Sequence, residues 1–162
     1  MHVTRLLFSR ASLMKRSSSP LSEKTPEILL VDDNPHGLIA RRAVLQELDY
    51  RVTTAVSGQE ALDLLAKRVF DVVVTDYKMP SMDGIELIKR IRAANPRVRV
   101  ILLSGYVEPL GLCEQITGAD LVIAKSAGEI AHMTRAIRRL LSEPLARKPA
   151  ASAKPTAKRA RA

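Results

Sequence analysis

Aromatic residues, cysteine and long apolar runs are all scarce in this chain of 162 residues. Aromatic side chains make up 3% of the composition, Trp is absent, and Cys113 is the single cysteine. One cysteine cannot form an internal disulfide, so nothing requires an oxidising compartment, and we expect a cytoplasmic protein. No apolar run approaches the roughly 18 residues that a membrane-spanning helix needs, so we expect no membrane partner.

The overall composition is that of a globular protein. Hydrophobic residues account for 46% of the chain and charged residues for 27%. These values exclude wholesale disorder, collagen-like repetition and a coiled-coil rod. The length suits about one domain of ordinary size.

The formal net charge is +9, which on its own would suggest a nucleic acid or an anionic surface as partner. The excess lies at the two ends, because residues 1–25 carry five Lys or Arg and one acid, and residues 143–162 carry six and one. Residues 26–142 hold fifteen basic and fifteen acidic side chains. We therefore expect one charge-balanced domain over 26–142, with a disordered basic leader over 1–25.

The segment 143–162 is rich in Ala, Pro, Lys and Arg and nearly free of large apolar side chains. Such a segment cannot bury enough surface to fold, so we expect a disordered basic tail. It offers no aromatic side chain for stacking on bases. Any nucleic acid would therefore bind through charge alone, without sequence preference and with strong sensitivity to salt.

Between these ends, short apolar runs rich in β-branched residues alternate with segments of helical periodicity. The runs are nearly continuous rather than alternating, which is typical of strands that are covered on both faces of a parallel sheet. Strand and helix in regular alternation predict a doubly wound α/β domain with a five-stranded parallel sheet and helices on both faces. The predicted strands are 27–31, 51–55, 71–75, 99–102 and 121–124.

Helix starts are marked by capping residues. Asn34 and Pro35 open a helix that is predicted to end near Leu48. A shorter helix is expected over 110–117. Arg41 falls inside the apolar stripe of the first helix, and we expect its stem to pack while its head reaches water. Three further starts follow from a cap and a carboxylate three residues later: Ser57 with Glu60, Asp83 with Glu86, and Ser126 with Glu129.

Polar residues follow four of the predicted strands. Because the carboxyl ends of parallel strands meet at one edge of the sheet, a ligand site is expected there. Crowded carboxylates favour a hard cation such as Mg²⁺, and a lysine, a hydroxyl and backbone amides would hold a phosphate beside it. These residues are Asp32 and Asp33 after the first strand, Asp76 after the third, Ser104 and Gly105 after the fourth, and Lys125 after the fifth.

The motifs VDDNP, VVVTDYKMPSMDG, ILLSGY and GADLVIAKS resemble, in order and spacing, the receiver domain of two-component response regulators. The resemblance covers residues 26–142 and implies the flavodoxin-like fold of CheY-like receivers. It identifies Asp76 as the phosphoacceptor. By the same resemblance Asp33 and Asp76, with the backbone carbonyl of Lys78, hold Mg²⁺, and Asp32 assists through water.

The resemblance also implies that Ser104, Gly105 and Lys125 contact the phosphoryl group. It implies phosphorylation by a histidine kinase or a histidine phosphotransfer protein, and signalling through contacts with a downstream protein target. The chain is then not an enzyme, although it assists its own phosphoryl transfer and dephosphorylation. The face formed by the fourth helix, fifth strand and fifth helix is the expected output surface and could also form a homodimer.

Two positions depart from the usual receiver pattern. Val122 stands where receivers commonly carry Tyr or Phe, so Tyr106 is the candidate switch aromatic in this chain. Ser126 follows Lys125 where receivers usually have Pro, often after a cis bond. A cis bond without Pro costs roughly 3 kcal/mol, so this loop is expected to enforce the bond or to be rearranged.

Two other functions stay open at this point. The basic tail would make the chain a nonspecific DNA-binding effector. A Mg²⁺-dependent phosphohydrolase on a related fold is less well supported, because its nucleophilic Asp would follow the first strand with a second Asp two residues later. Here Asp32 and Asp33 are adjacent, and the acceptor-like Asp76 follows the third strand.

Overall fold

The computed structural model describes residues 24–144. The predicted leader over 1–25 lies almost entirely outside the described residues, and the predicted tail over 143–162 lies largely outside them. Both therefore stay predictions. Within 24–144, no helix is long and apolar enough to cross a membrane.

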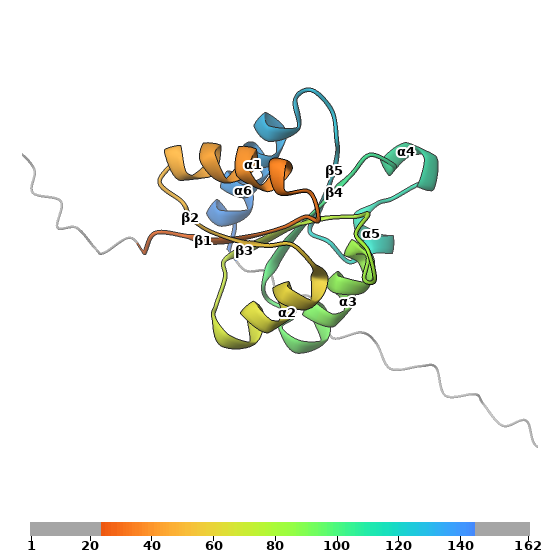
Figure 1. The fold of residues 1–162 in the computed structure, drawn as a ribbon, viewed down its shortest axis with the longest axis horizontal. Coiled ribbons are helices and arrows are strands. Elements are labelled where there is room, and N and C mark those ends of the chain that lie inside the picture. Colours follow the sequence, from red (N-terminus) through yellow and green to blue (C-terminus); the bar gives the residue numbers. More distant parts are fainter. Residues whose placement is uncertain (1–23, 145–162) are drawn as a thin grey trace, which may run out of the picture.

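The described residues contain one five-stranded sheet in which every pairing is parallel and the strand order is β2-β1-β3-β4-β5. This confirms the doubly wound α/β fold that the sequence predicts. Figure 1 shows the sheet between two layers of helices. The strands are β1 (Glu27–Val31), β2 (Arg51–Ala55), β3 (Val72–Asp76), β4 (Arg99–Ser104) and β5 (Leu121–Ala124).

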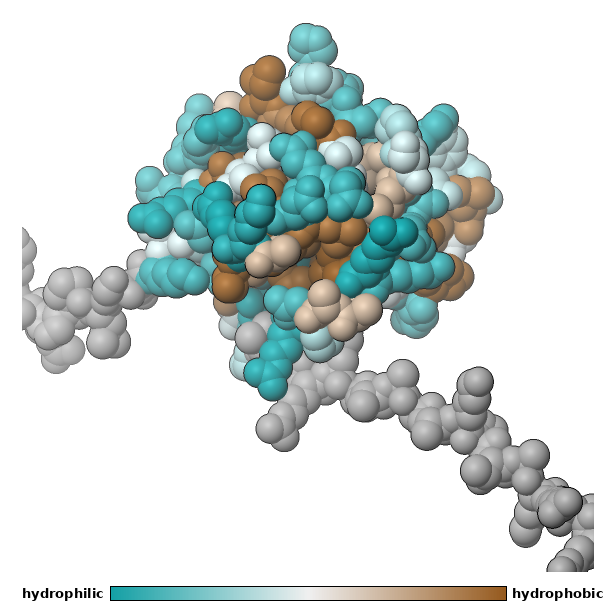
Figure 2. All heavy atoms as spheres, turned by 60° about the horizontal axis from the view of Figure 1, so that its bottom comes forward, coloured by the Kyte–Doolittle hydropathy of each residue, from teal (hydrophilic) through white to brown (hydrophobic). Residues whose placement is uncertain are grey.

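Helices cover both faces of the sheet. Helices α1 (Pro35–Glu47) and α6 (Glu129–Ser142) lie on one face, and α2 (Gly58–Lys67) and α3 (Gly84–Ala94) lie on the other (Figure 1). Seen from the side of α2 and α3, hydrophilic side chains cover much of the surface and apolar side chains show between them (Figure 2). The helices therefore turn their apolar sides to the sheet and their polar sides to water.

The core has one half on each face of the sheet, because successive strand residues point to opposite faces. In β1, Leu29 and Val31 pack with residues of α2 and α3, whereas Ile28 and Leu30 pack with residues of α1 and α6. All four side chains are almost completely buried. Burial on both faces explains why this strand has no polar alternation.

Three of the predicted helix starts are confirmed by side-chain caps. The Asn34 side chain accepts hydrogen bonds from the backbone N–H groups of His36 and Gly37 at the start of α1. Ser57 caps α2 and Asp83 caps α3 by accepting from the N–H three residues later, at 3.2 and 2.8 Å. These local contacts set where each helix begins.

The predicted cap at Ser126 is wrong. Helix α6 begins at Glu129 with Gly128 as its N-cap, and no side chain makes a capping hydrogen bond. The backbone carbonyl of Ser126, rather than its hydroxyl, accepts from the Glu129 N–H at 3.0 Å. The Glu129 carboxylate instead accepts a hydrogen bond from Arg41, on α1.

The single helix predicted over 110–117 is also wrong. Two separate turns are present instead, α4 (Val107–Leu110) and α5 (Glu114–Thr117). Gly111 ends α4 in a left-handed conformation with φ of 58°, which interrupts any continuous helix. Glycine is the residue that adopts this conformation without strain.

Candidate functional site

A cleft of about 570 Å³ opens at the carboxyl ends of β1, β3 and β5. Its lining includes the predicted site residues Asp32, Asp33, Asp76, Gly105 and Lys125. The loop that follows β3 completes one wall. Polar residues at four strand ends therefore lie at one edge of the sheet, although Ser104 is buried and is not among the residues that line the cleft.

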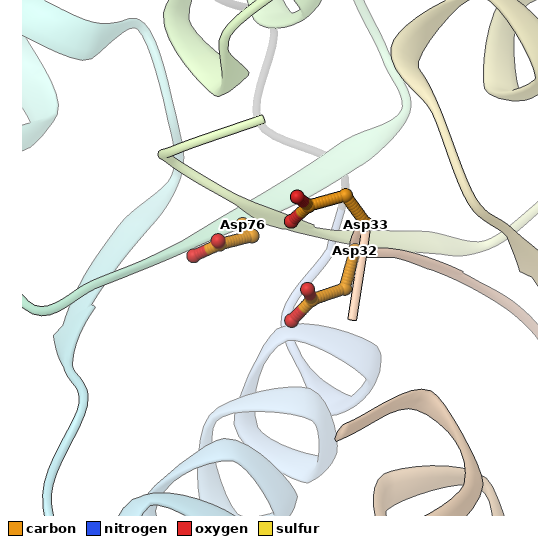
Figure 3. Close-up of side chains that lie close together, drawn as sticks. All are labelled: Asp32, Asp33 and Asp76. Atoms are coloured by element: carbon orange, nitrogen blue, oxygen red, sulfur yellow. The ribbon is translucent and has the colours of Figure 1, made fainter. Parts of the chain in front are cut away.

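Three carboxylates lie together in this cleft. Asp32 and Asp33 come from the end of β1 and Asp76 from the end of β3 (Figure 3). Each offers an oxygen within 4.8 Å of the others. Asp32 and Asp76 are buried, with 2% and 6% exposed, whereas Asp33 is exposed. Several hard oxygen donors with one exposed member are a suitable set for a divalent cation such as Mg²⁺.

Lys125 lines the cleft and supplies a positive charge beside Asp76. Its Nζ lies 2.8 Å from Asp76 Oδ1 and 3.5 Å from Asp32 Oδ2. The Lys125 N–H donates to the Ser104 carbonyl at 2.8 Å, which fixes the backbone where β5 ends. The lysine therefore reaches both buried carboxylates from a defined position on the sheet edge.

The surroundings of Asp76 disfavour the ionised form of its carboxyl. Burial is the main reason that the pKa of the Asp76 carboxyl lies above its ordinary value, and the charge of Asp32 raises it further. The hydrogen bond and charge of Lys125 act against this shift, as does the Tyr77 backbone, without cancelling it. A cation that entered the cleft would favour the ionised form.

Arg41 lies behind the cleft, and the expectation that its head reaches water is wrong. Its side chain is 9% exposed, with Nη1 at 2.7 Å from Asp32 Oδ2 and Nε at 2.6 Å from Glu129 Oε1. Burial alone would lower the pKa of Arg41, but the hydrogen bonds and charges of Glu129 and Asp32 raise it above its ordinary value. The guanidinium stays inside because both of its partners are carboxylates.

The residues at the end of β4, Ser104 to Tyr106, form a tight turn beside the cleft. Ser104 is buried at 1% exposed, and its Oγ accepts a hydrogen bond from the Tyr106 N–H at 2.9 Å. Gly105, between them, lines the cleft. Tyr106 is 43% exposed. Its ring lies edge-on to the Tyr77 ring, with 6.4 Å between the ring centres, and Lys78 Nζ is 5.6 Å from its centre.

The loop after Asp76 turns sharply into α3 at Gly84. The Gly84 N–H donates to the Tyr77 carbonyl at 2.8 Å. A side chain at Gly84 would collide with the carbonyl oxygen of Asp76 and with Leu102. Glycine is thus required here by the close approach of α3 to the backbone of Asp76.

The two departures from the receiver pattern also have structural outcomes. Val122 is partly buried and packs against the core on the α2 and α3 side of the sheet. No cis peptide bond occurs among residues 24–144, so the bond between Lys125 and Ser126 is trans. The loop between β5 and α6 is therefore built without the cis bond that receivers often have.

The fold and the site define a flavodoxin-like α/β protein with an acidic, lysine-containing cleft at the carboxyl edge of its sheet. The family model described as "Response regulator receiver domain" matches residues 28–138. The chain therefore belongs to the response regulator receiver domain family, and its function is in two-component phosphorelay signalling.

Two curated relatives match this chain over about half of its length. Sporulation initiation phosphotransferase F of Bacillus subtilis (strain 168) is 38% identical over 82 residues, which cover 51% of this chain and 66% of that protein. Transcriptional regulatory protein ZraR of Escherichia coli O157:H7 is 40% identical over 80 residues, which cover 49% of this chain. The match spans only 18% of the length of ZraR.

Solved structures agree on the fold. The response regulator protein TrrA of Thermotoga maritima, solved in complex with Mg²⁺-BeF, has a TM-score of 0.65 and 29% sequence identity. The similarity covers 72% of this chain and 99% of that one. It supports the CheY-like receiver fold.

Proposed function

We propose that Asp76 accepts a phosphoryl group from a histidine kinase or a histidine phosphotransfer protein. The arrangement of Asp76 carries this proposal: it is a buried carboxylate at the end of β3, 2.8 Å from Lys125 and within 4.8 Å of two further carboxylates. Such surroundings suit a group that must attack an anionic donor, because the donor's charge needs nearby cations. Receiver domains are phosphoacceptors, and B. subtilis sporulation initiation phosphotransferase F is by name a phosphotransferase.

Asp33, Asp76 and the backbone carbonyl of Lys78 would hold Mg²⁺, with Asp32 assisting through water. The ion would supply charge neutralisation for the donor and for the product. The complex of TrrA with Mg²⁺-BeF supports this choice of metal. The exposed carboxylate of Asp33 and the buried one of Asp76 line the same cleft, so both are accessible to one ion.

In the transfer step a carboxylate oxygen of Asp76 attacks the phosphorus atom in line with the donor bond. The phosphorus–nitrogen bond of the phosphohistidine breaks, its electron pair returns to the imidazole, and an acyl phosphate forms on Asp76. Lys125 Nζ, the Ser104 hydroxyl and the Gly105 N–H would contact the phosphoryl oxygens. Since an acyl phosphate is labile, the modification is temporary and suits a switch.

The output would be a change at the predicted output face. The turns α4 and α5 stand in the place of its predicted fourth helix, and β5 and α6 complete it. This face would bind a downstream protein target or a second copy of the chain. Ser104 connects the site to this face, because its Oγ holds the Tyr106 N–H at the start of α4. When the Ser104 hydroxyl turns to a phosphoryl oxygen, this contact changes. Tyr106 is the proposed switch aromatic.

Phosphorylation of the full chain with acetyl phosphate and Mg²⁺, followed by intact mass spectrometry, tests the acceptor. The wild type gains one phosphoryl group and Asp76→Asn gains none. Asp63→Asn, an exposed carboxylate on α2, is the matched control and behaves as wild type. Equal modification of wild type and Asp76→Asn would show that another residue is the acceptor.

The role of Tyr106 is tested with Tyr106→Ala and the control Tyr106→Phe. Tyr106→Ala is expected to accept the phosphoryl group normally but to lose the amide chemical-shift changes that phosphorylation causes along β5 and α6. Tyr106→Phe keeps the ring contact with Tyr77 and keeps these changes. An unchanged response in Tyr106→Ala would remove Tyr106 from the switch.

A further inference from the structure

Arg41 and Glu129 form a largely buried ion pair that contacts the acidic cleft through Asp32. Arg41 Nε and Glu129 Oε1 are 2.6 Å apart, and the side chains are 9% and 12% exposed. The residues are 88 positions apart and join α1 to the first residue of α6. The proposed phosphoryl-transfer step gives neither of them a role.

We propose that this pair sets the Mg²⁺ affinity of the cleft, with Arg41 as a positioning residue that holds Asp32 and offsets its charge. Glu129 in turn limits how much positive charge Arg41 presents to the metal. The inference rests on the proposed magnesium site. It adds two residues that determine how tightly that site binds.

Asp32 is held on both of its oxygens. Oδ1 accepts from the Asn34 N–H at 2.8 Å, and Oδ2 accepts from Arg41 Nη1 at 2.7 Å. Rotating this carboxylate to coordinate a metal directly would break both hydrogen bonds in a buried place, which is costly. Arg41 thus keeps Asp32 in an outer position and leaves Asp33 and Asp76 to coordinate the ion.

The formal charges in the cleft predict whether Arg41 and Glu129 raise or lower its Mg²⁺ affinity. Asp32, Asp33, Asp76 and Lys125 together carry a formal charge of −2, which one Mg²⁺ neutralises. Arg41 and Glu129 add no net charge as a pair. Neutralising either one changes the charge near the metal by one unit, and in a partly buried site this changes ion affinity by about tenfold.

A purely structural role predicts a different result. An ion pair that only joined α1 to α6 would, when broken from either side, loosen the domain and weaken metal binding in both cases. The electrostatic role predicts opposite signs for the two partners. The two single variants therefore separate these explanations.

Isothermal titration of the full chain with Mg²⁺ alone tests the proposal. Arg41→Met is expected to bind Mg²⁺ about tenfold more tightly, and Glu129→Gln, farther from the metal, about threefold more weakly. The double variant Arg41→Met/Glu129→Gln is expected to bind Mg²⁺ only about threefold more tightly than wild type, because the two effects have opposite signs. Thermal unfolding without metal identifies variants that fail to fold.

Matched controls come from α1 itself. Arg42→Met and Glu47→Gln remove exposed charges of the same signs, and both are expected to leave Mg²⁺ affinity unchanged. If Arg41→Met does not fold, Glu129→Gln still tests the proposal, since the amide oxygen that it introduces can still accept a hydrogen bond from Arg41.

Folded single variants with wild-type affinity would overturn the inference, and so would weaker binding by Arg41→Met. In both cases wild-type Mg²⁺ binding leaves the proposed function standing. Failure of the wild type to bind Mg²⁺ would instead contradict the proposed metal site, and the inference would fall with it.

Discussion

At the scale of single residues, the burial of Asp76 has a consequence for stability. Burial raises the pKa of its carboxyl, so the ionised form is less favourable in the folded protein than in the unfolded chain. Because the pKa is raised on folding, the protonated form of Asp76 favours the folded state. Its contribution to the free energy of unfolding is fully present below the unfolded pKa of about 3.9 and is lost as pH rises through the folded pKa.

We therefore predict that Asp76→Asn, measured without metal, is more stable than wild type at neutral pH. The gain shrinks as pH falls and disappears below about pH 3.5, where the carboxyl is protonated in both states. Thermal unfolding in chelator at several pH values checks this. Asp63→Asn is the control, and a less stable Asp76→Asn at neutral pH would contradict the electrostatic description of the cleft.

The convergence of the strand-end residues on one site could be predicted from the sequence, but the buried ion pair of Arg41 and Glu129 behind that site could not. Asp32, Asp76 and Lys125 follow apolar strands, and parallel strands must bring their ends together. Arg41 and Glu129 are 88 residues apart, and an Arg in an apolar stripe normally reaches water. An Arg at a buried helix position signals a hidden acidic partner, but only the tertiary structure identifies it.

At the scale of elements, the start of α3 positions the backbone of Asp76. A Cβ at Gly84 would overlap the Asp76 carbonyl oxygen and approach Leu102 to 2.8 Å. We predict that Gly84→Ala lowers the free energy of unfolding by roughly 1–3 kcal/mol, because backbone atoms cannot move aside as easily as a flexible side chain. Urea unfolding measures the loss.

Gly105→Ala is the matched control for Gly84→Ala, because a Cβ at Gly105 meets nothing within 4 Å. Its effect on stability is expected to stay within about 0.5 kcal/mol. Equal stability of Gly84→Ala and wild type would show that the turn into α3 does not depend on close backbone contact.

Helix starts set by a local cap could be predicted from the sequence, and the helix start whose carboxylate has a distant partner could not. The caps at Asn34, Ser57 and Asp83 need only a side chain and a backbone N–H a few residues later. The pairing of Ser126 with Glu129 has the same spacing but does not form, because the Ser126 backbone carbonyl accepts from the Glu129 N–H and Arg41 donates to the Glu129 carboxylate. The helix predicted over 110–117 failed because Gly111 turns the chain between two short helices.

At the scale of the whole molecule, the net charge of the domain differs from that of the chain ends: residues 26–142 are balanced, and the basic excess lies at the two ends. Residues 143–162 carry six Lys or Arg and one acid, and 145–162 lie outside the described residues. If this tail binds nucleic acid, chain 1–162 will shift duplex DNA at low salt, and chain 1–142 will not. Gel-shift assays at two salt concentrations measure this binding. Equal binding by both chains would show that the tail does not bind DNA.

The central claim is that Asp76 is a metal-dependent phosphoacceptor. Beryllofluoride binds a carboxylate oxygen in place of a phosphoryl group, so its binding reports the acceptor without a partner kinase. Titration of the full chain with and without Mg²⁺, in wild type, Asp76→Asn and the control Asp63→Asn, is the most direct test. We expect Mg²⁺-dependent binding by wild type and Asp63→Asn and none by Asp76→Asn; equal binding by wild type and Asp76→Asn would contradict the claim.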